Sequence, residues 1–224
     1  MDLTEFNDGE IPENVPIGLR PPFLYLQELF RQQQFGNVNV KGQLPPNLRF
    51  VLVSSHCSYF DVFILNSLFY AYGYDSYAVM AAEKVLKSHP LIGFVFARLL
   101  HCYPAASSKA IDSSVKILET SPIALCPESW AYLAEQPLKE FKTGAVRIAQ
   151  KANVPIVPVS IRYNRPGKWI EMFPFPLQIA LCFIFKLNKG NIRVNIGRQF
   201  DPRGDAKERT KALREEVVKL YEMK

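Results

Sequence analysis

Short apolar runs alternate along the chain with longer segments in which apolar residues recur at helical spacing. The runs predict strands. The run over 49–54 is typical of a strand buried on both faces, and the run over 123–127 predicts a buried strand. The other predicted strands cover 76–82, 101–104, 154–162 and 191–196. Predicted helices cover 59–72, 90–100, 107–119, 141–152 and 205–221. This alternation predicts an α/β fold, a single domain whose mostly parallel or mixed sheet is flanked by helices.

The N-terminal region differs in pattern from the rest of the chain. Residues 1–22 are polar and rich in proline, which predicts a loose arm. Over 23–35, Phe23, Leu26 and Phe30 share one helical face. This spacing predicts a short N-terminal amphipathic helix that packs on the domain or contacts a membrane. We therefore divide the chain into an N-terminal arm and helix, 1–36, and one main domain, 37–224.

No stretch reaches the roughly 18–20 apolar residues that a membrane-spanning helix requires. Segment 169–187 comes closest, but Glu171, Pro174 and Pro176 interrupt it. Its uninterrupted part, 177–185, fits either a core helix or a helix in a membrane interface. The start of the chain, MDLTEFNDGE, is too acidic for a signal peptide. We expect an intracellular protein held peripherally or monotopically on the cytoplasmic face of a membrane.

Composition narrows the function classes. Apolar residues make up 48% of the chain, which excludes wholesale disorder. The net charge is +6, and each well-placed basic residue would attract anionic lipid by about 1 kcal/mol. Nucleic acid is not an expected partner, because the basic residues form no run. The 4 cysteines form no Cys-x-x-Cys pair and only 3 histidines exist, so we expect no metal site of zinc-finger or ribbon type.

Polar side chains follow two of the predicted strands. Ligands of open α/β sheets bind beyond the carboxyl ends of the strands, which is where His56 and Glu128 are expected. Asp61 begins the helix after His56, and a turn between them can bring its carboxylate to one imidazole nitrogen. The other nitrogen then remains an acceptor, as in a general base. The simpler alternative is a helix-capping aspartate, a satisfied histidine and a loop glutamate.

Four blocks occur in a characteristic order. They are His56 with Asp61, then Pro127-Glu128, then Phe-Lys-x-Gly-Ala over 141–145, then Val-Pro-Ile-Val-Pro-Val over 154–159. In this order they resemble the glycerolipid acyltransferases, of which 1-acylglycerol-3-phosphate acyltransferase is the best-known type. The resemblance covers roughly 56–161, and it makes 37–224 an acyltransferase domain.

The resemblance implies a specific reaction. His56 would act as general base on an acceptor hydroxyl, and Asp61 would orient and polarise it. The hydroxyl would attack the thioester of acyl-CoA or acyl carrier protein, which serve as co-substrates, with no metal, no other cofactor and no acyl-enzyme. The implied acceptor is a lysophospholipid, foremost 1-acylglycerol-3-phosphate, and the implied setting is phospholipid biosynthesis.

The chain also departs from the family pattern. The family's Phe-Pro-Glu-Gly-Thr-Arg block is Cys-Pro-Glu-Ser-Trp-Ala here, so Ser129 replaces the glycine and the arginine is absent. The arginine of the family's second block is also absent from 101–106. Both arginines are associated with the acceptor's phosphate, for which a guanidinium is well suited. Cations that could replace them are Lys84, Arg98, Lys109, Lys139, Lys142 and Arg147.

Among these cations, Lys84 and Lys142 are the leading candidates, because both fall in matched positions of the pattern. We therefore expect Glu128, Lys84, Lys142 and Ser129 to contribute to substrate binding. Ordinary surface lysines are the simpler alternative. Two further readings stay open, namely an acceptor that lacks the phosphate and an inactive lipid-binding protein at a membrane surface.

Overall fold

The computed structural model describes residues 38–46, 49–57, 61–74, 76–81, 102–104, 109–128, 138–163 and 192–223, together with Phe173, Leu177 and Leu181. The arm predicted over 1–22 and the helices predicted over 23–35 and 90–100 lie outside these residues. Within them, no helix combines the length and the apolarity needed to cross a bilayer.

A seven-stranded sheet, in the order β1-β7-β6-β2-β5-β3-β4, forms the centre of the part that the structure describes. Every neighbouring pair is parallel except β6 and β7, which are antiparallel. This confirms the predicted α/β class and mostly parallel sheet. The strands are β1 (Val38–Lys41), β2 (Val51–Ser54), β3 (Ala78–Ala81), β4 (Cys102–Pro104), β5 (Ile123–Leu125), β6 (Ile156–Arg162) and β7 (Ile192–Ile196).

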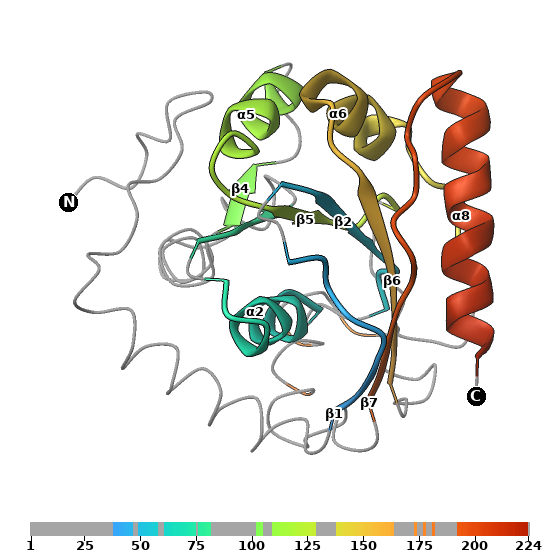
Figure 1. Ribbon diagram of the computed structural model, residues 1–224. Helices are drawn as coiled ribbons and strands as arrows, with labels where there is room; N and C mark the ends of the chain where they lie inside the picture. Colours follow the sequence, from blue (N-terminus) through green and yellow to red (C-terminus); the bar gives the residue numbers. More distant parts are fainter. Residues whose placement is uncertain are drawn as a thin grey trace, which may run out of the picture.

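Helices cover both faces of this sheet. Figure 1 shows α2 (Asp61–Ala71) on one side, with α5 (Ala110–Ile117) and α6 (Gly144–Ala152) on the other. The C-terminal helix α8 (Ala206–Glu222) packs against β6 and α6. All residues of β2 and β5 are buried, because these strands lie inside the sheet under both helical layers. The prediction that both strands are buried is therefore confirmed.

The sequence pattern did not predict β1. This strand reads Val-Asn-Val-Lys, and three of its four residues are exposed. Among the described residues, β1 pairs only with β7 at the edge of the sheet. An exposed edge strand does not need a continuous apolar run, because few of its side chains are buried. Such a short segment with one polar residue between two valines gives too weak an alternating signal to distinguish it from a loop.

Of the two prolines in the predicted strand 154–162, Pro155 precedes β6, and Pro158 lies at an interruption of the sheet. Pro158 pairs with Val53 of β2, but on its other side the ladder with β7 begins only at Val159. The carbonyl of Pro158 still accepts a hydrogen bond of 2.8 Å from the backbone N–H of Gly197. The missing N–H of proline therefore falls at an irregular position, where it costs no ladder bond.

Replacing Gly197 by alanine should destabilise the fold by about 1–3 kcal/mol, because it overpacks this irregular position. The new Cβ would lie 2.8 Å from Pro158 Cγ and 3.0 Å from Leu220 Cδ1. Gly144→Ala is the matched control, since a Cβ there meets no heavy atom within 4 Å. Denaturant unfolding of both variants tests the prediction, and equal stability of Gly197→Ala and wild type would contradict it.

Candidate active site

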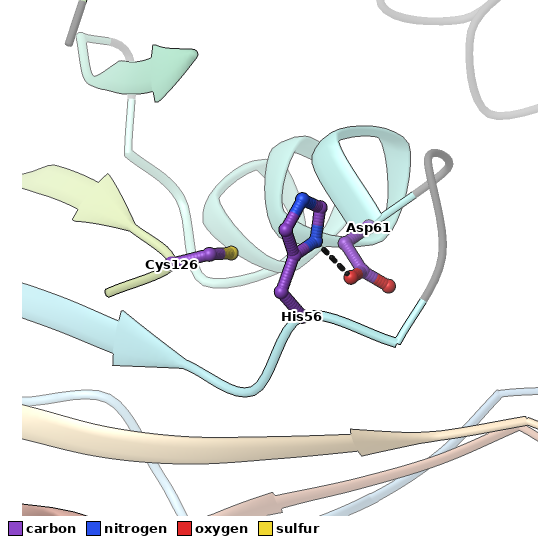
Figure 2. A group of neighbouring side chains, drawn as sticks. All are labelled: His56, Asp61 and Cys126. Atoms are coloured by element: carbon purple, nitrogen blue, oxygen red, sulfur yellow. Dashed lines mark hydrogen bonds and ion pairs between the residues drawn. The ribbon is translucent and has the colours of Figure 1, made fainter. Parts of the chain in front are cut away.

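His56 and Asp61 meet at the carboxyl edge of the sheet. His56 lies just beyond the end of β2, and Asp61 is the first residue of α2. The Nδ1 atom of His56 lies 2.8 Å from Oδ2 of Asp61, as predicted from their spacing (Figure 2). The side chain of Asp61 is 1% exposed, whereas that of His56 is 24% exposed. The pair therefore consists of a buried carboxylate and an imidazole that solvent can reach.

The Asp61 carboxylate accepts further hydrogen bonds. The backbone N–H of Cys57 donates to Oδ2 at 2.8 Å, and the hydroxyl of Tyr163 donates to Oδ1 at 2.7 Å. Burying a carboxylate is costly unless donors replace the lost water, and these contacts supply them. With such donors around it, Asp61 acts as an acceptor toward Nδ1–H of His56. The Nε2 atom of His56 then carries the lone pair, as a general base requires.

Sequence reasoning missed the contact between Tyr163 and Asp61. Tyr163 directly follows β6, so its position after a strand was a usable signal. Its side chain is buried, and this burial raises the pKa of the phenol well above the ordinary value. The charge of Asp61 and the hydrogen bond to it raise the pKa further. The hydroxyl therefore keeps its proton and donates a hydrogen bond to Asp61.

Glu128 lies beside His56, at the sheet edge where the sequence placed it. Its Oε1 accepts the backbone N–H of His56 at 2.8 Å, and its Oε2 accepts that of Lys139 at 3.2 Å. Burial raises the pKa of this carboxyl, and the two backbone donors partly oppose the rise. Both oxygens thus fix main-chain segments, which makes Glu128 a group that holds the backbone of His56 in place.

Of the other expected substrate-binding residues, the structure describes only Lys142. Lys142 is exposed, and its backbone N–H donates to the carbonyl of Pro127 at 3.1 Å. This contact places it next to the loop that carries Glu128. Lys84, Ser129 and Arg98 lie outside the described residues. Three further candidate cations are exposed, namely Lys109, Lys139 and Arg147.

Cys126 brings a thiol close to the pair. Its Sγ, a nitrogen of His56 and an oxygen of Asp61 all lie within 4.8 Å of one another (Figure 2). Burial raises the thiol pKa well above its ordinary value, and the nearby charges of Asp61 and Glu128 add to the rise. The oxygens of Asp61 already accept hydrogen bonds from His56, Cys57 and Tyr163, so they belong to the hydrogen-bond network of the imidazole. This set of donors suits proton transfer better than metal binding.

Comparison with known proteins identifies the family. A model of the acyltransferase family matches residues 37–162. The 1-acyl-sn-glycerol-3-phosphate acyltransferase of Bacillus subtilis is 30% identical over 146 residues, covering 62% of this chain and 68% of that enzyme. The enzyme of the same name from Saccharomyces cerevisiae is 31% identical over 121 residues, but the match covers 50% of this chain and only 38% of the yeast protein.

A solved structure has the same fold. It is the crystal structure of the 1-acyl-sn-glycerophosphate (LPA) acyltransferase PlsC from Thermotoga maritima, with a TM-score of 0.61 and 20% sequence identity. The superposition covers 90% of this chain and 80% of that one. Because the family model spans more than half of the sequence and includes His56, Asp61 and Glu128, the chain belongs to the acyltransferase family.

Proposed function

We propose that this protein transfers a fatty acyl group from a thioester to the free hydroxyl of a lysophospholipid. The observation that carries the proposal is the 2.8 Å contact between His56 Nδ1 and the buried Asp61, which leaves Nε2 of a partly exposed imidazole as proton acceptor. Both curated relatives are named as 1-acyl-sn-glycerol-3-phosphate acyltransferases, which supports lysophosphatidic acid as the leading acceptor.

In the proposed step, Nε2 of His56 takes the proton of the acceptor hydroxyl while that oxygen attacks the thioester carbonyl. The tetrahedral intermediate then collapses, the carbon–sulfur bond breaks, and the proton passes from the imidazolium to the departing thiolate. The products are an ester and a free thiol, so no metal or redox cofactor is needed. Such proton transfer is worth about 10²–10⁴-fold in rate. Positioning and donors aimed at the oxyanion supply the remainder.

The donor we propose is acyl-CoA or acyl carrier protein, and the setting is phospholipid biosynthesis. Since the acceptor is a lipid, we also propose that the protein works at a membrane surface, peripherally or monotopically on the cytoplasmic face. The net charge of +6 favours attraction to anionic lipid.

The acceptor's phosphate needs a cation near the edge that holds His56. We propose that Lys142 supplies part of this charge, because its main chain contacts Pro127, the neighbour of Glu128. The absence of both family arginines favours a second candidate acceptor, a lipid alcohol without the phosphate. The two acceptors differ in the anion, so a comparison of acceptors separates them.

An acyl-transfer assay over several acceptors tests this proposal. Purified protein would receive labelled acyl-CoA or acyl carrier protein with lysophosphatidic acid, other lysophospholipids, glycerol-3-phosphate or lyso-glycolipids in mixed micelles. We expect the highest kcat/KM with lysophosphatidic acid, and we expect Lys142→Ala to raise the KM for it by about 3–10-fold.

Lys116→Ala is the matched control for Lys142→Ala. Lys116 is an exposed lysine in the last turn of α5. The carbonyl of Leu118, just after α5, accepts a hydrogen bond from Nε of Arg49. Arg49 lies just before β2, whereas His56 lies just after it, so the end of α5 is at the opposite edge of the sheet. Product only from phosphate-free acceptors would favour the second acceptor class. Lipid binding with no product from any acceptor would overturn the proposed activity.

A further inference from the structure

Asp61 is held from two separate parts of the chain. Its Oδ2 contacts Nδ1 of His56 and the N–H of Cys57, both on the loop after β2. Its Oδ1 accepts the hydroxyl of Tyr163, which lies 102 residues further along, at the end of β6. Two oxygens of one carboxylate thus receive donors from different sides.

We infer that Tyr163 is a positioning residue of the general base, acting on His56 through Asp61; this rests on the proposed function. A carboxylate can rotate about its terminal bond, and either oxygen can then face the imidazole. The Tyr163 hydroxyl holds Oδ1 at 2.7 Å, which fixes Oδ2 toward His56. Because Tyr163 is only 6% exposed, water competes poorly for this contact.

The same hydrogen bond also sets the proton affinity of the pair. A donor on Oδ1 draws negative charge away from Oδ2 and so weakens its attraction for a proton on His56. Removing the donor raises the proton affinity of the coupled pair, whichever member takes the proton. The pair must be deprotonated to act as a base. The acid limb of the rate profile should therefore move to higher pH without the hydroxyl.

Other titratable groups surround the pair in the part of the chain that the structure describes. They are Glu128 on the loop after β5, Cys126 at the end of β5 and Cys57 beside His56. Burial keeps the thiol of Cys126 protonated. The pKa of Glu128 is raised, so Glu128 could contribute to the acid limb. Glu128 is present in both the wild type and the Tyr163 variant, so its titration does not account for a difference between their acid limbs.

The test is Tyr163→Phe, which keeps the ring and removes only the hydroxyl. We expect kcat to fall by about tenfold, with KM for the acceptor unchanged within about twofold. We expect the acid limb of the kcat/KM profile to move up by about 0.5–1 pH unit. A monofluorinated tyrosine at position 163, which is a stronger donor, should move the limb the other way. This second variant keeps the test decisive even if the phenylalanine variant folds poorly.

Tyr103→Phe is the matched control. Tyr103 in β4 is 3% exposed, and its hydroxyl also contacts one side chain, Ser114 Oγ at 3.0 Å. Its loss should lower stability but leave the pH profile unmoved. In an Asp61→Asn background, Tyr163→Phe should produce no further shift of the limb, because Tyr163 acts through Asp61.

Three results bear on the inference in different ways. A Tyr163→Phe profile that matches wild type, as the Tyr103→Phe profile should, would overturn it. An acid limb that Tyr163→Phe shifts equally in the wild-type and Asp61→Asn backgrounds would also overturn the inference. Full activity of His56→Ala would instead overturn the proposed function. The two failures are therefore distinguishable in one set of variants.

Discussion

Replacing His56 by alanine should lower kcat for acyl transfer by about 10²–10⁴-fold, while the KM for the lipid acceptor changes little. The variant loses Nε2, the atom proposed to take the hydroxyl proton. Binding of the lipid and of the thioester does not depend on that atom. Steady-state kinetics with labelled acyl-CoA and lysophosphatidic acid measure both parameters.

The fold should tolerate this change, because the His56 side chain is 24% exposed. The hydrogen bond from its backbone N–H to Glu128 also does not involve the imidazole. A thermal unfolding curve close to that of wild type is the control. Added imidazole should restore part of the activity of His56→Ala, since the space left at the base is open to solvent. Activity near that of wild type without imidazole would contradict the assignment.

Asp61→Asn is expected to lower kcat by about 10²–10⁴-fold as well, for a different reason. The amide keeps the shape, and the Tyr163 hydroxyl can turn to accept from it. The negative charge that stabilises the imidazolium is lost. The acid limb of the pH profile should therefore move to lower pH, which is opposite to the shift expected for Tyr163→Phe.

The pH dependence of the rate distinguishes stabilisation of the imidazolium by Asp61 from a merely structural role of this residue. A structural role would lower stability and activity together and leave the midpoint of the acid limb in place. Asp112→Asn is the matched control, because Asp112 is an exposed aspartate near the start of α5 that pairs with Lys151 at the surface. It should change neither kcat nor the profile. An unmoved limb in Asp61→Asn would contradict the proposed pairing.

Much of the fold could be predicted because the buried strands carry continuous apolar runs. β2 and β5 lie inside the sheet, so every position is apolar or small and the signal is strong. The contact between His56 and Asp61 was also predictable, because a strand end and the next helix start are separated by one short turn. Local spacing in the sequence was sufficient in both cases.

The remaining features depend on contacts between distant segments. The position of Tyr163 directly after a strand places it at an edge of the sheet, but its contact with Asp61 depends on β6 and β2 being neighbours, which the sequence pattern does not show. Substrate binding by Glu128 stays a prediction, and the sequence did not indicate that its oxygens hold the main chain of His56 and Lys139. The edge strand β1 lacked an apolar run, since most of its surface is exposed.

The central claim is that His56 activates the acceptor hydroxyl for direct attack on the thioester. Quenched single turnovers with acyl-labelled CoA test it most directly, because they follow the label on protein and lipid together. We predict that label passes from CoA to lysophosphatidic acid without residing on the protein, and that His56→Ala slows this transfer by about 10²–10⁴-fold. Label bound covalently to the protein before product forms, for example on the Cys126 thiol beside His56, would contradict the account.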